Sequence, residues 1–185
     1  MGTSILRIVL FVAAAAAVAV GVEPSRLDSW VLVGRHDQHL GGSTRDLSRA
    51  LAVAGDGPAL WARRGGDAWL IRDVKLVARA RALLAPLDEL GQKMAPLGQK
   101  QGVLGARQGE MGRQMGELSS DPERNGAAME ALGRRMEALG REQEAIGRDQ
   151  EAIGARMEAA GRELDAKMAA LVDEARAAGQ AQPVK

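Results

Sequence analysis

The chain contains no cysteine and no tyrosine, and its aromatic residues are one phenylalanine and three tryptophans. Without cysteine the protein forms no disulfide, offers no thiolate as a metal ligand or nucleophile, and has no cysteine to carry a lipid anchor. Its formal net charge of +1 gives none of the excess of basic residues that nucleic-acid binding requires. The composition therefore argues against a disulfide scaffold, a cysteine enzyme and a DNA- or RNA-binding protein.

Residues that belong to common catalytic and metal-binding motifs are also scarce. The sequence has no Gly-x-Ser-x-Gly, no His-Glu-x-x-His and no phosphate-binding loop. Its two histidines, His36 and His39, form the only metal-like cluster, to which Asp46 could add a carboxylate. A zinc site needs three or four ligands held in place by further hydrogen bonds. We therefore expect no bound metal, no cofactor and no catalytic residue, and keep His36 and His39 only as metal candidates.

The first part of the chain is typical of a secretory signal peptide over residues 1–21. Arg7 ends a short basic region, Ile8 to Val20 is an unbroken apolar run, and small residues precede the expected cleavage site after Gly21. Cleavage would remove one arginine and leave a neutral mature chain. The alternative is an uncleaved inner-membrane anchor over residues 5–22, although this run is short for a spanning helix. We predict a periplasmic protein, because an exported chain without cysteine fits that compartment.

Residues 22–86 are predicted to form a small α+β head with the order strand, helix, hairpin, helix. The β-branched stretch at residues 30–36 predicts a strand, and Ser43 is placed to cap an amphipathic helix that ends at Gly55. The glycine pair at 65–66 lies between two apolar stretches and predicts a tight hairpin turn, after which a second helix follows. A domain of this size is near the lower limit for an independent core.

The tryptophans of the chain all fall within this head, at Trp30, Trp61 and Trp69. We predict that they form the core of the head, because large aromatic side chains contribute most to the burial of apolar surface in small domains. The alternative is that they form a platform on which a ligand stacks.

From residue 87 onward, apolar residues recur every seven positions, which is the pattern of a coiled coil. With Leu90 at heptad position d, the predicted interaction seam consists of Leu90, Leu97, Leu104, Met111, Leu118, Leu132, Leu139, Ile146 and Ile153. We predict a first helix at 87–118, a break or turn at 119–125, a second helix at 126–178 and a disordered tail at 179–185. The break permits a bend or a hairpin, and we favour a hairpin because it would pair the two helices.

Glycine occupies the next heptad position, e, along both predicted helices, and in the second helix these residues are Gly133, Gly140, Gly147 and Gly154. Each glycine lowers helix propensity by about 1 kcal/mol relative to alanine. One interpretation is that another backbone approaches closely on this side, which makes the glycines part of the interaction seam. The alternative is that the repeat expanded and the glycines are merely tolerated.

A resemblance to a known family extends over residues 29–165, from WVLVGRHDQHLGGSTRDLSRA through LWARRGGDAWLIRDVKLVARARAL to LGQKQGVLGARQGEMG. In these segments the chain resembles the extracytoplasmic regions of Bla-regulator-type bacterial membrane sensors and metallopeptidases, and their stand-alone exported relatives. The chain lacks the His-Glu-x-x-His and the several membrane helices of the peptidase, so the resemblance implies no protease activity. It implies a sensing or accessory role in the cell envelope.

These observations predict a periplasmic, non-enzymatic interaction or structural protein. Its arm would self-associate or dock on an envelope protein, and the chain would contact the membrane only if its N-terminal segment stayed uncleaved. The alternative is a ligand- or metal-binding sensor or accessory domain of the envelope. A metal-dependent hydrolase that uses His36 and His39 is a third hypothesis.

Overall fold

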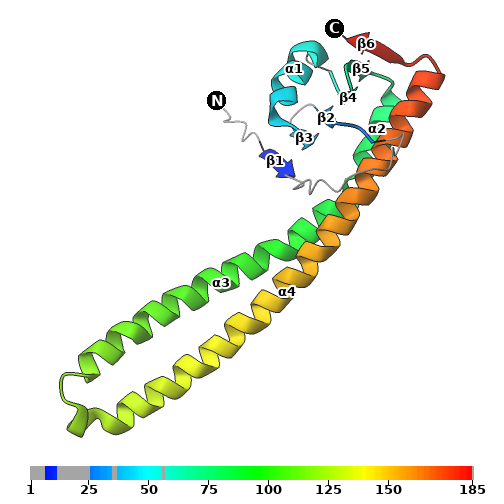
Figure 1. The fold of residues 1–185 in the computed structure, drawn as a ribbon. Helices are drawn as coiled ribbons and strands as arrows, with labels where there is room; N and C mark the ends of the chain where they lie inside the picture. The colour runs from blue at the N-terminus through cyan, green and yellow to red at the C-terminus, as the bar shows by residue number, and fades with distance from the viewer. Residues whose placement is uncertain (1–6, 12–25, 35–36, 56, 185) are drawn as a thin grey trace. The chain divides into compact units, whose positions relative to one another are not determined.

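The structure is a computed structural model that describes residues 7–11, 26–34, 37–55 and 57–184. The chain divides into two compact units: a head, which holds Met1–Leu87 and Glu158–Lys185, and an arm, Asp88–Met157. The predicted fold class is confirmed, because an α+β head is followed by long helices that form a helical hairpin (Figure 1). The predicted signal peptide lies largely outside the described residues and stays a prediction.

The head is built on a six-stranded sheet in the order β1-β3-β2-β4-β5-β6. The strands are β1 (Arg7–Phe11), β2 (Ser29–Val33), β3 (Asp37–Gly41), β4 (Ala59–Arg64), β5 (Asp67–Ile71) and β6 (Ala181–Val184). β1 pairs with β3 in parallel, and every other neighbouring pair is antiparallel. Because β1 lies within the predicted signal peptide, its cleavage would leave the antiparallel sheet of β2 to β6. The helices of the N-terminal half are α1 (Thr44–Ala54) and α2 (Val74–Ala82).

The two faces of the sheet carry different tryptophans. Trp61 is aligned with Val31 and Leu70 across β2, β4 and β5, and belongs to a buried cluster with residues of α1. Trp30 and Trp69 are aligned across the same strands on the opposite face, because side chains alternate along a strand. All three tryptophans are buried. The core of the head therefore has two layers, one on each side of the sheet.

Three strands were not predicted from the sequence, and one of them, β1, falls within the predicted signal peptide. β3 forms a hairpin with β2, although its sequence DQHLG is polar and was interpreted as part of a metal-like cluster on a turn. β6 corrects the prediction of a disordered tail, because Ala181–Val184 pairs with β5 along its whole length. Strand pairing uses backbone groups, so a short polar segment joins a sheet wherever the fold brings it to a free edge.

The head also includes the C-terminal part of the last helix, which the sequence interpretation had assigned to the arm. Helix α4 (Pro122–Ala177) contributes its residues from Glu158 onward to the head. The buried side chains of this segment are Leu164, Met168, Ala169, Leu171, Val172 and Ala175. The sequence contains a signal for the change from arm to head along α4. The e-position glycines end at Gly161, and Met168 takes the next e position. From there the apolar spacing is that of a helix packed on a core.

The arm consists of α3 (Ala85–Leu118) from Asp88 onward, a turn and the first part of α4. Pro122 is the first residue of α4, where its missing backbone N–H costs nothing, so the second helix begins earlier than the predicted start at 126. The turn is closed by the side chain of Asn125, which donates to the carbonyl oxygen of Leu118 at 3.0 Å. A proline inside a helix usually kinks or ends it, but α3 runs through Pro96 as one helix. Pro96 is exposed, so water can satisfy the carbonyl group that the proline leaves without a partner.

Candidate functional site

The predicted seam of the arm lies between its two helices. Leu104, Leu139 and Ile146 form a buried cluster, against which Leu97 and Met111 pack. Leu132 is also buried, whereas Leu90, Leu118 and Ile153 are half-exposed. The structure therefore brings the d residues of α3 and α4 together, but the pairing of two helices covers only some of them completely.

Two pairs of glutamines show the register of the hairpin. The side chain of Gln143 donates to that of Gln108, and the side chain of Gln150 donates to that of Gln101, each at 3.1 Å. These residues occupy heptad position a, and the second pair is one heptad further from the turn on both helices. The same register sets Met115 level with Met136, so that like residues face each other across the arm. The glutamine layers disfavour a shifted register, because a shift would place a glutamine amide against a methionine.

The e-position glycines do not provide close contact between the two helices. The register sets Leu104 level with Gly147 and Ile146 level with Gly105, yet a Cβ atom built at any of the heptad glycines would meet no atom within 4 Å. This finding corrects the interpretation that Gly133, Gly140, Gly147 and Gly154 allow the backbone of the paired helix to approach. Within this hairpin they occupy positions that an alanine would also fit.

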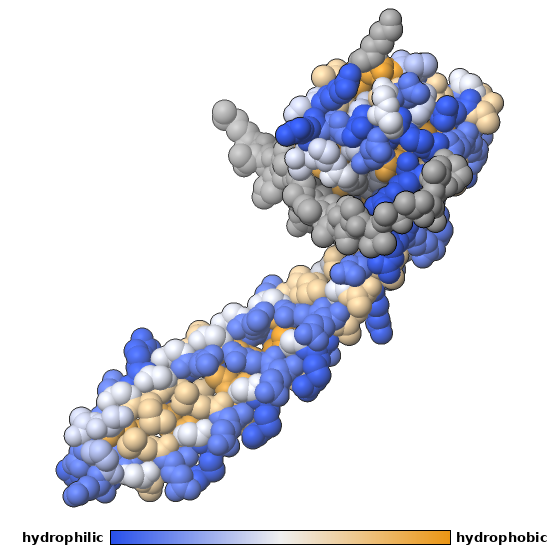
Figure 2. Space-filling model, in the orientation of Figure 1, coloured by the Kyte–Doolittle hydropathy of each residue, from blue (hydrophilic) through white to orange (hydrophobic). Residues whose placement is uncertain are grey.

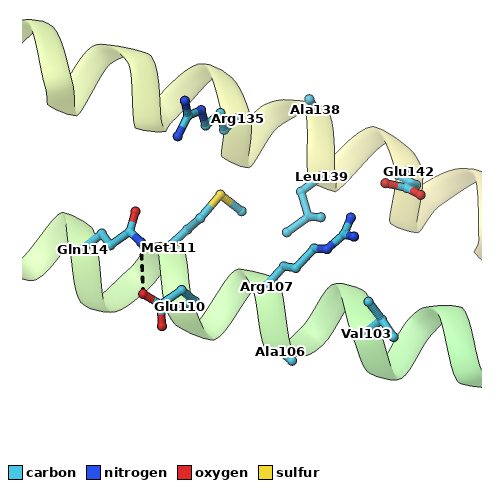
Figure 3. A pocket seen from close by; sticks show the side chains of 10 residues that line it. All are labelled: Val103, Ala106, Arg107, Glu110, Met111, Gln114, Arg135, Ala138, Leu139 and Glu142. Carbon is cyan, nitrogen blue, oxygen red and sulfur yellow. Dashed lines mark hydrogen bonds between the residues drawn. The ribbon is translucent and has the colours of Figure 1, made fainter.

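One side of the arm carries an apolar groove between α3 and α4, with a volume of about 700 Å³. Its apolar lining residues are Val103, Ala106, Met111, Ala138 and Leu139. Figure 3 shows Met111 and Leu139 pointing toward each other across the space between the two helices, and Figure 2 shows apolar surface along the arm between hydrophilic margins. Val103 is 53% exposed and is one of two large apolar side chains on the described surface with such exposure.

Charged residues border this groove on both helices. Arg107 and Glu110 belong to α3, and Arg135 and Glu142 belong to α4. Glu110 accepts hydrogen bonds from Arg113 and Gln114 on its own helix, which lower the pKa of its carboxyl group. Arg135 and Glu142 form no hydrogen bond or ion pair with any described residue. In contrast, the nearby Arg134 pairs with Glu130 at 2.6 Å on the outer side of α4.

In the head, the C-terminal segment of α4 is held by contacts to the sheet and to α2. The indole N–H of Trp30 donates to Asp165 at 3.0 Å, and Arg64 forms a two-point contact with Asp173. The guanidinium of Arg176 lies 4.2 Å from the ring centre of Trp69. These contacts support a structural role for the two tryptophans rather than the alternative of an open stacking platform, because a helix of the same chain covers their side of the sheet.

A further ion pair joins this segment to α2. Arg79 donates to both carboxylate oxygens of Glu174, at 2.5 and 2.8 Å. The hydrogen bond from Arg79 lowers the pKa of the Glu174 carboxyl group, and the same contact raises the pKa of Arg79. Both side chains are more than half exposed, so solvent screens the pair and its contribution to stability is small.

Replacement of Glu174 by glutamine is therefore expected to lower the stability of the head slightly at neutral pH and to lose its effect in acid. The folded state lowers the carboxyl pKa, so the stabilisation is present above the pKa of the unfolded chain and disappears as the pH falls through the folded pKa. Thermal unfolding of the full chain and of Glu174→Gln, followed from about pH 7 to about pH 3, measures this difference. A difference that stays constant over this range would contradict it.

The structure describes only part of the predicted histidine cluster. His36 lies outside the described residues. His39 is buried in β3, where its Nε2 atom lies 3.4 Å from a carboxylate oxygen of Asp37, and Asp37 also accepts from Arg81. Asp46, the suggested third ligand, belongs to α1 and instead accepts from the guanidinium of Arg63 at 3.0 and 3.1 Å. Among the described residues, no group of three or more histidines and carboxylates is placed to hold a metal ion.

A smaller cavity of about 210 Å³ lies beside Trp30 in the head. It is lined by Arg26, Asp28 and Asp165 together with the backbone at Gly41 and Gly42. The indole of Trp30 lies over Gly41, where a larger residue would collide with it. This cavity was not predicted from the sequence, because its lining residues come from three segments far apart in the chain.

Comparison of the chain with profiles of known protein families, with curated proteins and with solved structures finds no match. The resemblance to the extracytoplasmic regions of Bla-regulator-type sensors therefore stays a hypothesis. Among the described residues, no helix combines the length and the hydrophobicity that a membrane-spanning helix needs.

Proposed function

We propose that this protein is an exported, non-enzymatic interaction protein of the bacterial cell envelope, and that its helical arm binds another protein chain. The observation that carries the proposal is the apolar groove of the arm, in which Val103 is exposed and Met111 and Leu139 form the floor. Methionine gives a surface that adapts to an apolar partner, and contiguous apolar surface bordered by charge is typical of protein interaction sites. The signal-like N-terminal sequence supports an extracytoplasmic location.

The incomplete seam of the arm gives a second line of support. A hairpin of two helices buries a narrow stripe, and here several d residues stay half-exposed after pairing. Helical hairpins with such seams reach a well-packed core when further helices cover the exposed side. The partner surface that fits the groove is therefore another amphipathic helix or helical hairpin.

The proposal is tested by a photo-reactive amino acid placed at Val103 in the full chain, expressed in a bacterial host. We expect illumination to link the groove to a protein of the envelope, and N-terminal sequencing of the linked product to begin at Val22. The matched control carries the same photo-reactive residue at Ala155, which is exposed on α4 and does not line the groove. Equal linking at both positions, or none at Val103, would show that the groove binds no protein.

The alternative of a ligand-binding sensor rests on the cavity beside Trp30. Its mixed charges and its volume of about 210 Å³ suit a small zwitterionic molecule. This second hypothesis predicts that the tryptophan fluorescence of the purified chain changes on addition of such a molecule, whereas binding in the arm leaves it unchanged because the arm contains no tryptophan.

A further inference from the structure

The arrangement of charges on one stretch of α4 is symmetrical. Arg135 lies three residues before Ala138, and Glu142 lies three residues after Leu139, and these four residues all line the groove. A helix that runs antiparallel to an identical copy, with the crossing point between Ala138 and Leu139, would therefore set Arg135 of each copy opposite Glu142 of the other. This is the reciprocal pattern of an isologous interface.

The same two charges lack the partners that other charges of the arm have within their own helix. The residues three and four positions away from Arg135 and Glu142 on α4 are alanine, leucine or isoleucine, so neither side chain can form an ion pair along its helix. Glu130 and Arg134, by comparison, are four residues apart and do form one. Two unpaired charges of opposite sign thus border an apolar groove at equal distances from the point between Ala138 and Leu139, and the small side chain of Ala138 permits close approach.

From these observations we infer that the groove is occupied by a second copy of this chain. The two hairpins pack with their α4 helices antiparallel across Ala138, forming a four-helix bundle. Val103 of each copy is covered in the bundle, and the half-exposed seam residue Met111 is covered with it. This inference rests on the proposed function, because it names the partner of the groove that the photo-reactive residue at Val103 tests.

The first experiment measures the mass of the full mature chain by light scattering over a range of concentrations. We expect a dimer that dissociates on dilution. Ala138→Glu places a carboxylate at the crossing point of the two helices and is expected to raise the dissociation constant about a hundredfold. Ala155→Glu is the matched control, because it is the same substitution at an exposed site of the same helix outside the groove. It is expected to leave the dissociation constant unchanged.

The second experiment tests the reciprocal charge pairs. Arg135→Glu alone sets two pairs of carboxylates against each other and is expected to weaken the dimer about tenfold. The double variant Arg135→Glu with Glu142→Arg reverses both charges and is expected to restore the dimer, because each pair is again of opposite sign. Far-UV circular dichroism checks that all variants keep the helical content of the parent chain.

Several results would overturn the inference. A chain that is monomeric at all concentrations excludes the dimer, and a dimer that Ala138→Glu does not weaken uses another surface. Failure of the charge-reversed double variant to restore the dimer shows that Arg135 and Glu142 do not pair between copies. If the chain is monomeric but the residue at Val103 links to a different protein, the inference fails and the proposed function stands. If nothing is linked at Val103, both fail.

Discussion

A chain that ends at Met157 is expected to lose the fold of its head. The missing segment supplies four large buried side chains, Leu164, Met168, Leu171 and Val172. Burial of such a side chain contributes about 1.5–3 kcal/mol, so the four together contribute about 6–12 kcal/mol. This is comparable with the whole stability of a typical domain, about 5–15 kcal/mol. The remaining sheet would also expose Trp30 and Trp69 to water.

Tryptophan fluorescence measures this effect, because exposure of the indoles shifts their emission to longer wavelength. The control is a chain that ends at Gly179, which loses β6 but keeps all of α4. We expect it to remain folded with reduced stability. Addition of a peptide with the sequence of residues 158–185 to the shorter chain should restore the native emission. If a chain that ends at Met157 unfolds cooperatively and with the same unfolding midpoint as the full chain, the head folds without the C-terminal helix.

The second large effect is expected from the heptad glycines. Replacement of Gly133, Gly140, Gly147 and Gly154 by alanine should stabilise the arm by about 4 kcal/mol, because each site gains about 1 kcal/mol of helix propensity. No packing penalty opposes this gain, since a Cβ atom at these positions meets no atom within 4 Å. Hydrogen exchange of the backbone amides of the arm, measured in the full chain, reports the local stability of these helices.

Gly65→Ala serves as the control for this prediction. A Cβ atom at Gly65 also meets no atom within 4 Å, but the residue has a φ of 61° in the turn between β4 and β5. Alanine is strained in that conformation, so this substitution is expected to destabilise the head. If the four alanines instead destabilise the arm, a backbone does approach these glycines and the close-packing interpretation is correct after all.

The heptad pattern could be extracted from the sequence because it depends on local spacing. Leu104, Leu139 and Ile146 were assigned to the seam from their spacing alone, and the structure places all three in one buried cluster. The hairpin was favoured because folding back pairs the two helices, and Pro122 begins the second of them. The groove was not predicted, because Val103, Ala106 and Ala138 lie outside the heptad seam and come from two helices.

The sequence by itself determined the helices, the central strands and their order, because capping residues, turn glycines and heptad spacing act over a few neighbouring residues. Ser43 and Asp73 cap their helices, and Gly65 makes the hairpin turn, as their local chemistry requires. The tertiary structure decided which distant segments share a core. Contacts between residues far apart in the chain decide that the helix around Met168 completes the head and that β6 joins its sheet. Such contacts also decide that the heptad glycines face open space. Burial of apolar surface is not directional, and no local spacing of residues specifies the partner against which a helix is buried.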